Sequence, residues 1–102
     1  MSLKQFSDTQ ILQMLGTRFK DYRLGTNLSQ SELAKAAGVS VSTVHKFETG
    51  TIVNMTITNL MALLRQVGLL ERCDELIPEQ PLSPYASTQI KRRQRVRRSN
   101  NG

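Results

Sequence analysis

Cysteine and histidine are almost absent from this chain of 102 residues, which contains one of each, Cys73 and His45. A single cysteine excludes an intramolecular disulfide bond and a cysteine-rich zinc site, so we expect Cys73 to act as a small apolar residue on the last helix. The sequence also has no glycine-rich phosphate loop and no pair of carboxylates with a supporting base. These absences argue against an enzyme, and we expect neither a cofactor nor a metal ion.

Long apolar runs and strand patterns are missing as well. No run is long enough to span a membrane, and the N-terminus lacks the apolar core of a signal peptide. Neither a strand of useful length nor an internal repeat is present. We therefore expect an all-α protein that is located in the cytoplasm and associated with the nucleoid.

Positive charge is what the chain does contain, and most of it lies near the C-terminus. Residues 1–77 hold eight Lys or Arg and seven Asp or Glu, which gives a net charge of +1. Residues 78–102 hold six Lys or Arg and one Glu, which gives a net charge of +5. The second segment has three prolines and few apolar residues, so it cannot bury enough surface to offset its ordering entropy. We expect a folded domain over residues 1–77 and a flexible tail over residues 78–102, with a short helix from about 87 to 98 forming only on a partner. The basic residues of this tail are Lys91, Arg92, Arg93, Arg95, Arg97 and Arg98.

The most informative pattern within the domain is the segment from Ser29 to Gly50, SQSELAKAAGVSVSTVHKFETG. Ser29 and Glu32 have the spacing of a capping box at the start of one helix, and Gly38 has the backbone freedom needed to end it. Ser40 is placed to cap a second helix, which stops at Gly50. Two short helices joined by a tight turn with glycine are the layout of a DNA-binding helix-turn-helix.

The second of these helices has two different faces. Val44 and Phe47 are three residues apart, so they share one face and should pack inward. The opposite face carries hydroxyl groups, an amine and a methyl-bearing side chain, which suit the base edges of the major groove. It consists of Val41, Ser42, Thr43 and Lys46. The alternative is that these residues form an exposed helix face with no partner. His45 lies at the flank of this face, and we expect it near a phosphate or in solvent.

Helices are also predicted on both sides of this segment. Ser7 and Gln10 can form a capping box ahead of a helix from about Thr9 to Leu24, along which apolar residues recur at spacings of three and four. These apolar residues are Leu12, Leu15, Phe19 and Tyr22. Downstream, Thr56 can cap a helix that stops at Gly68. Asn54 and Thr56 can also donate hydrogen bonds to a phosphate at the positive end of that helix, and plain capping is the alternative.

A last short helix is predicted from about Leu69 to Ile77, where Pro78 ends it, which brings the count to five helices. Its apolar residues exceed what such a short element of a small domain needs; they are Leu69, Leu70, Cys73, Leu76 and Ile77. They predict a two-fold dimer interface, because two DNA half-sites ~34 Å apart require paired recognition helices. Packing within the chain, under the first helix, is the alternative.

Residues from about Leu15 to Leu69 resemble the Cro/XRE family of helix-turn-helix repressors. The resemblance rests on LGTRFKDYRL, on LSQSELAKAAGVSVSTVHKFETG and on the downstream helix that ends LLRQVGL. It implies a five-helix, lambda-repressor-like domain that binds a double-stranded DNA operator as a homodimer and represses transcription. Within that family the resemblance implies that Gln30 touches a phosphate and that Ser40 lies close to the DNA backbone.

The same resemblance assigns further roles. It implies that Val41, Ser42 and Lys46 contact base edges, joined by Thr43, and that Arg23 and Glu48 form an ion pair linking the first and third predicted helices of the domain. Many relatives have a polar, base-bonding side chain where this chain has Val41, so contact with a thymine methyl group is the natural substitute there.

A narrower resemblance covers GLLERCDELIPEQPLSP followed by KRRQRVRR, which is similar to small regulators of the HipB type. It implies a repressor of its own toxin–antitoxin operon that binds or helps to neutralise a HipA-like kinase toxin, together with a further small antitoxin subunit in some systems. The basic tail then contacts either DNA phosphates or an acidic toxin surface. Two alternatives are a phage or restriction-modification control repressor without a toxin partner and a protein-interaction adaptor on the same scaffold.

Overall fold

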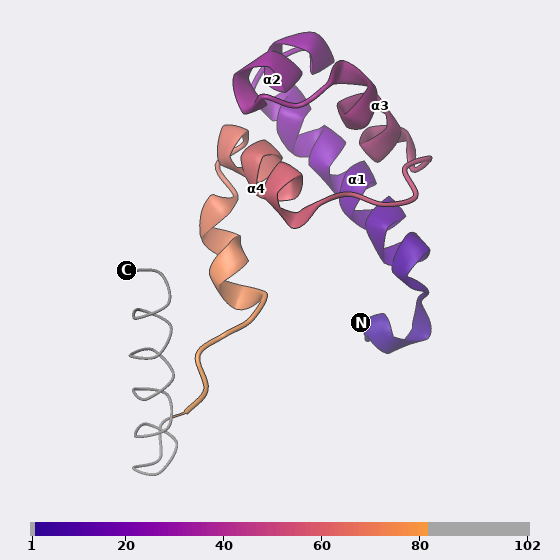
Figure 1. Ribbon diagram of the computed structural model, residues 1–102, viewed down its shortest axis with the longest axis vertical. Helices are drawn as coiled ribbons and strands as arrows, with labels where there is room; N and C mark the ends of the chain where they lie inside the picture. The colour runs from indigo at the N-terminus through magenta and orange to yellow at the C-terminus, as the bar shows by residue number, and fades with distance from the viewer. Residues whose placement is uncertain (1, 82–102) are drawn as a thin grey trace, which may run out of the picture.

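Helices are the only regular secondary structure in residues 2–81, the part of the chain that the computed structural model describes. Four α-helices, α1 (Asp8–Gly25), α2 (Gln30–Ala37), α3 (Val41–Thr49) and α4 (Ile57–Gln66), are preceded by one 3-10 helix, η1 (Leu3–Gln5), and followed by another, η2 (Leu70–Glu75) (Figure 1). The all-α prediction is confirmed. The expectations for the basic tail, from Lys91 to Arg98, fall outside the described residues.

Hydroxyl side chains start all four α-helices, at the predicted positions. The side-chain oxygen of Ser7 accepts a hydrogen bond from the backbone N–H of Gln10 at 3.1 Å, and that of Ser29 accepts one from Glu32 at 3.0 Å. Both pairs are complete capping boxes, because the Gln10 and Glu32 side chains accept from the backbone N–H groups of Ser7 and Ser29. The side chains of Ser40 and Thr56 likewise accept from the backbone N–H groups of Thr43 and Asn59 at the starts of α3 and α4, without the reciprocal bond of a capping box. Backbone donors that would otherwise lack partners are thus satisfied where each helix begins.

The C-terminal helix differs from its prediction in type and length. The sequence predicted a helix from about Leu69 to Ile77, whereas η2 is a 3-10 helix over Leu70–Glu75, and no side chain caps its start at Leu69. An uncapped segment of six residues forms too few α-helical hydrogen bonds to offset the cost of starting a helix, and 3-10 turns are frequent in connecting segments. The short η1 was not predicted at all.

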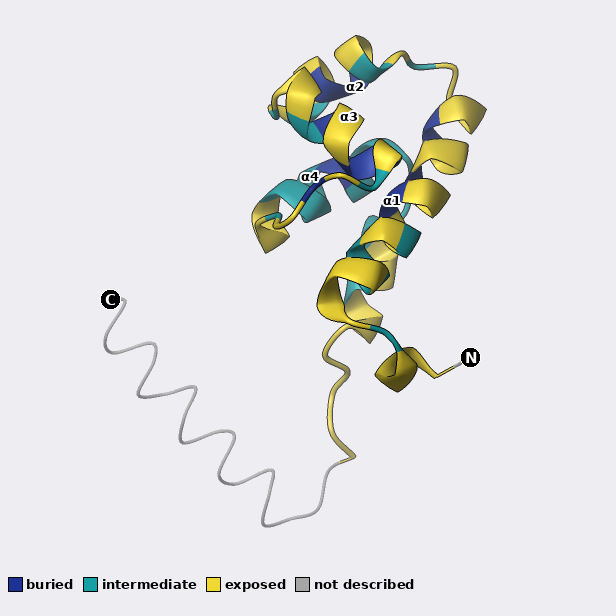
Figure 2. Ribbon diagram, turned by 90° about the vertical axis from the view of Figure 1, so that its right-hand side faces the viewer, coloured by how far each residue is buried: buried dark blue, intermediate teal, exposed yellow. Residues whose placement is uncertain are grey.

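A small apolar core holds α1 to α4 together. Its buried residues are Phe19, Leu33, Ala34, Val44, Phe47, Ile52 and Leu63. The rings of Phe19 and Phe47 lie 5.5 Å apart between centroids, which joins α1 to α3. Figure 2 shows the buried residues where these helices face one another and exposed residues on their outer surfaces. None of the helices in residues 2–81 combines the length and the apolar character that crossing a membrane requires.

Gly16 marks the closest approach of α1 to α3. A Cβ atom added at Gly16 would lie 1.8 Å from the carbonyl oxygen of Phe47 and 2.7 Å from its carbonyl carbon. Both are backbone atoms, which cannot rotate away as a side chain can. The angle and position of α3 against α1 therefore depend on the missing side chain of Gly16, a residue that no sequence pattern had singled out.

Candidate nucleic-acid interface

The connection between α2 and α3 is the tight turn expected of a helix-turn-helix. Gly38 ends α2 with a left-handed backbone, φ 73°, which glycine adopts without strain. The N–H of Val39 then donates to the carbonyl oxygen of Ala34 at 3.0 Å, a bond that closes the end of α2. Ser40 follows as the cap of α3. The turn therefore consists of residues 38–40 and sets the start of α3 close to the end of α2.

The two faces of α3 are separated as its spacing predicted. Val44 and Phe47 are buried in the core, whereas Val41, Ser42, His45 and Lys46 are exposed and Thr43 is half-buried. Because the inward side chains are fixed by packing, the outward ones are presented from a rigid element. A helix of nine residues needs this packing to be stable.

Four of the predicted DNA-binding residues line one surface hollow. Ser42, Thr43 and Lys46 of α3 meet Asn54 from the loop that leads to α4. The hollow thus combines hydroxyl, amine and amide groups, which can donate hydrogen bonds to phosphates or base edges. Thr51, Ile52 and Val53 complete its lining. Neither Thr51 nor Val53 was among the predicted site residues, although their place directly after Gly50, at the end of α3, is the signal that points to them.

Val53 in this loop is exposed, with 79% of its surface accessible. Thr51 is tied to α3, because its N–H donates to the carbonyl oxygen of Lys46 at 3.0 Å. The loop is therefore held beside the exposed face of α3, and its tip carries an apolar side chain next to Asn54.

The hydroxyl groups of Ser40 and Thr56 already serve as caps. Ser40 Oγ accepts from the N–H of Thr43 at 3.1 Å and lies 2.8 Å from Thr43 Oγ1. Thr56 Oγ1 accepts from the N–H of Asn59 at 3.1 Å. A hydroxyl oxygen has two lone pairs and one hydrogen, so the capping bonds leave room for a contact with a phosphate.

A buried ion pair joins the end of α1 to α3. Arg23 Nε and Nη2 donate to the two carboxylate oxygens of Glu48 at 2.7 and 2.9 Å, and only 8% and 1% of the two side chains are accessible. Arg23 Nη1 donates to the carbonyl oxygen of Leu28 at 2.8 Å. This two-pronged geometry is the strong form of an arginine–carboxylate pair, and it also fastens the segment between α1 and α2.

Gln30, at the start of α2, belongs to the same network. Its Nε2 donates to Glu48 Oε1 at 3.0 Å. An amide nitrogen carries two hydrogens, so one N–H bonds Glu48 and the second can reach another acceptor. The sequence had assigned Gln30 to a phosphate alone, with no indication that it would also bond Glu48.

Opposing effects act on the Glu48 carboxyl group. Its burial alone raises the pKa, whereas the hydrogen bonds from Arg23 and Gln30 and the nearby positive charge lower it, and the pKa lies below its ordinary value of 4.5. The hydrogen bond with Glu48 likewise raises the pKa of Arg23. Both groups therefore remain charged near neutral pH, and the pair stabilises the fold as ions.

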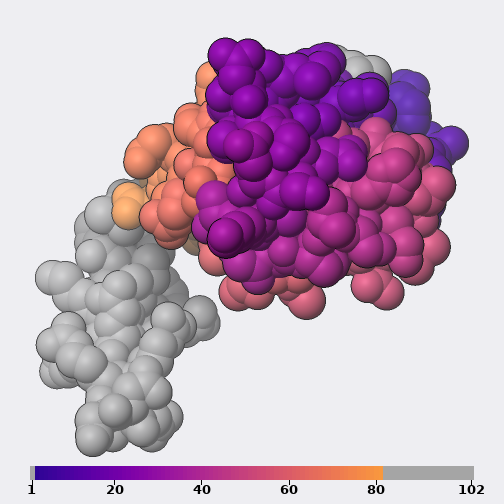
Figure 3. Space-filling model, turned by 90° about the horizontal axis from the view of Figure 1, so that it is seen from above, coloured from indigo at the N-terminus to yellow at the C-terminus, as the bar shows by residue number. Residues whose placement is uncertain are grey.

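The predicted dimerisation residues take different positions. Leu69, Cys73 and Leu76 line a groove between α1 and η2, Leu70 is half-buried, and Ile77 is exposed. Figure 3 shows the molecule from above, with the orange C-terminal segment on the opposite side from the pink loop between α3 and α4. The segment that carries the predicted dimerisation residues therefore lies across the molecule from the loop between α3 and α4.

Comparison with known proteins agrees with this architecture. A family model described as a helix-turn-helix domain matches residues 14–76, which is more than half of the chain. The chain therefore belongs to this helix-turn-helix family, and it is a DNA-binding regulator of that class. A search of the curated proteins gave no match.

Proposed function

We propose that the protein is a sequence-specific transcriptional repressor that places α3 in the major groove of its operator. The observation that carries this proposal is the hollow in which Ser42, Thr43 and Lys46 meet Asn54. Polar groups from a recognition helix and from the following loop then face the DNA together. Base edges and phosphates offer the matching acceptors.

The proposed contacts divide into two kinds. Gln30, Ser40, Asn54 and Thr56 bind phosphates and orient the domain. All except Asn54 lie at or next to the first residue of α2, α3 or α4, and Asn54 lies in the loop before α4. The N-terminal ends of helices favour anions because their N–H groups point outward there. Base edges are contacted by Val41, Ser42, Thr43 and Lys46, with Val41 against a thymine methyl group.

A homodimer is part of the proposal, because a two-fold pair of domains reads two half-sites about 34 Å apart. The domain over residues 1–77 supplies both the recognition helix and the dimerisation residues. The six cations from Lys91 to Arg98 add affinity by neutralising phosphates, or else bind an acidic protein surface.

Regulation of a toxin–antitoxin operon is the biological setting we infer. It is supported by the similarity of GLLERCDELIPEQPLSP and KRRQRVRR to HipB-type regulators. In that setting the chain represses its own operon and binds or helps to neutralise a HipA-like kinase toxin, in some systems with a further small antitoxin subunit. Co-purification with the products of neighbouring genes tests this part, and recovery of the chain without a kinase argues for a phage or restriction-modification control repressor.

The DNA-binding proposal is tested by a gel shift with the region upstream of the chain's own gene, repeated at several salt concentrations. We expect tighter binding to this region than to random DNA of equal length, and a protection footprint with two half-sites. Ser42→Ala should weaken the preference for the upstream region over random DNA. Lys35→Ala, which alters an exposed side chain of α2, should leave that preference unchanged. Binding no tighter than to random DNA rejects the repressor and favours an adaptor role.

A further inference from the structure

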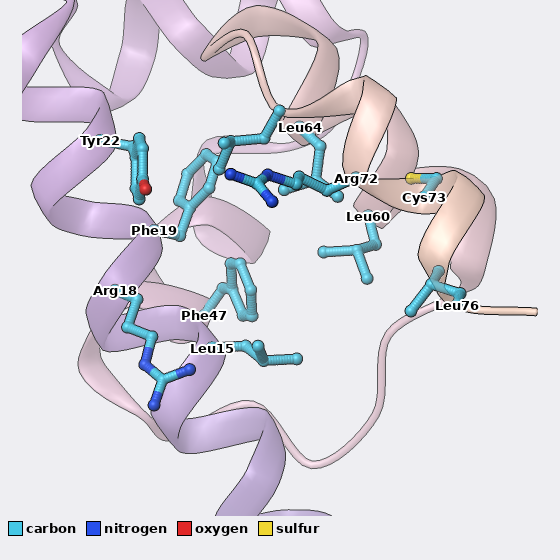
Figure 4. A pocket seen from close by; sticks show the side chains of 11 residues that line it. Leu15, Arg18, Phe19, Tyr22, Phe47, Leu60, Leu64, Arg72, Cys73 and Leu76 are labelled. Atoms are coloured by element: carbon cyan, nitrogen blue, oxygen red, sulfur yellow. The ribbon is translucent and has the colours of Figure 1, made fainter. Parts of the chain in front are cut away.

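A groove with apolar walls lies between α1 and η2. It has a volume of about 230 Å³, and the rings of Phe19 and Phe47 belong to its lining. Figure 4 shows side chains of α1 on one side of it, including Leu15 and Tyr22, and those of α4 and η2 on the other, including Leu60 and Cys73. The groove is therefore lined by apolar side chains that adjoin the buried core.

Apolar residues around the groove remain uncovered in the single chain. Leu15 and Tyr22 follow the apolar stripe of α1, yet 39% and 50% of their surfaces are accessible. The reason is that η2 is short and packs on α4, so it does not close over α1. Ile77, two residues beyond the end of η2, is 89% accessible. Exposed apolar side chains around a groove mark an interaction site.

The charges around the groove are arranged in two groups. Arg18 from α1 and Arg72 from η2 contribute to its lining. Within the chain, Arg72 Nη1 lies 3.4 Å from Glu75 Oε1 at the exposed surface. An exposed ion pair of this kind contributes little to the stability of the fold. Acidic groups are exposed elsewhere on η2 and do not line the groove; they are Glu71, Asp74 and Glu75.

We propose that a second copy of this chain docks in the groove, with the exposed end of η2 inserted reciprocally. Ile77 of each copy enters the apolar groove of the other, and the acidic residues of its η2 pair with Arg18 and Arg72 across the two-fold axis. Such an interface is self-complementary, as two-fold symmetry requires. It extends the dimer surface beyond the last helix to α1.

Charge favours a second copy over the chain's own basic residues 91–98 as the occupant. Residues 82–102 contain six Lys or Arg and no Asp or Glu. Two arginines line the groove, so the six cations from Lys91 to Arg98 would meet like charges there, which is unfavourable at an interface. The η2 helix of a second copy brings acidic and apolar groups together instead.

A charge-swap experiment on the full chain tests the proposal. The first variant carries Arg18→Glu and Arg72→Glu, and the second carries Glu71→Lys, Asp74→Lys and Glu75→Lys. All five side chains are exposed, so we expect the fold to be kept, as circular dichroism will show. Each variant alone should dimerise at least tenfold more weakly than the wild type in sedimentation equilibrium. An equimolar mixture should recover the dimer, because both sets of opposite charges then face each other.

Two controls complete the test. Lys35→Glu with Arg65→Glu makes the same change in net charge as the first variant, at exposed positions outside the groove, and it should leave dimerisation unchanged. Alkylation of Cys73, on the groove wall, should slow as the wild-type concentration rises into the dimeric range. A wild type that is monomeric throughout, variants that dimerise as the wild type does, or a mixture that does not recover would each overturn the proposal.

This inference rests on the homodimer of the proposed function but not on DNA binding. If the mixed variants recover the dimer while the wild type shows no preference for its upstream region, the groove assignment stands and the repressor proposal fails. If the preference is present while the charge swap has no effect, the repressor proposal stands and the groove assignment fails.

Discussion

Replacing Gly16 with alanine adds one methyl group at the point where α1 and α3 come closest. The new Cβ would lie 1.8 Å from the carbonyl oxygen of Phe47, far inside van der Waals contact. Because that oxygen belongs to the backbone of α3, relief requires one helix to shift relative to the other. The ring contact between Phe19 and Phe47 lies at the same place and would be disturbed.

Two opposing effects set the size of the loss. Alanine is a better helix former than glycine by about 1 kcal/mol in a helix interior, and overfilling a packed site costs about 1 to 3 kcal/mol, or more where backbone must move. Since the clash at Gly16 involves backbone, we expect a net loss of about 2 kcal/mol in the free energy of unfolding. For a domain of this size that lowers the Tm by about 8 to 16 °C.

The same substitution on the same helix provides the control. A Cβ added at Gly25 meets nothing within 4 Å, so Gly25→Ala should leave the Tm unchanged or raise it. Thermal unfolding followed by circular dichroism compares both variants with the wild type. Equal Tm values for Gly16→Ala and the wild type would refute the claim that the α1–α3 approach requires glycine. A parallel gel shift should show weaker specific binding by Gly16→Ala at temperatures where it is still folded, because α3 is displaced.

Three other predictions concern the ion pair, the recognition helix and the tail. Glu48→Gln leaves the charge of Arg23 buried without its partner and should cost about 3 kcal/mol in chemical denaturation at pH 7. The folded-state pKa of Glu48 lies below 4.5, so the charged carboxylate stabilises the wild type above pH 4.5. This stabilisation is lost as the pH falls through the lowered pKa. A Glu48→Gln variant whose free energy of unfolding falls with acid in the same way would contradict this. Lys46→Ala should relax base preference at one operator position and cost ~1–3 kcal/mol in quantitative gel shifts, whereas a uniform loss on all sequences would mean a phosphate contact. Deleting residues 82–102 should reduce the salt dependence of DNA binding by up to about five units of slope if all six cations contact phosphates, and an unchanged slope would place the tail away from DNA.

Local chemistry explains why so much of the fold could be predicted. Ser7, Ser29, Ser40 and Thr56 precede helices in the sequence, and each caps one in the structure, because a cap depends on groups within three residues. The burial of Val44 and Phe47 likewise follows from helical spacing. The 3-10 form of η2 was missed because a short uncapped segment has no dominant local preference.

The site was less predictable where it depends on contacts between distant residues. Asn54 meets Ser42 and Lys46 around one hollow because the loop folds back along α3, which no spacing reveals. Gly16 has a role only because Phe47 lies against it, 31 positions later in the chain. The exposure of Leu15 and Tyr22 follows from the way η2 packs, although their spacing alone predicts a buried stripe.

The hydrogen bond from Gln30 to Glu48 bears on the entropy of binding DNA. A glutamine free in solvent loses several rotameric states when it grips a phosphate, which costs about 0.5 to 1.5 kcal/mol for an immobilised side chain. Gln30 has lost that freedom during folding, since Glu48 Oε1 accepts one of its N–H groups at 3.0 Å. In the proposed complex its remaining N–H is therefore oriented before the DNA arrives, and a core carboxylate reduces the entropic penalty of operator binding without touching the operator.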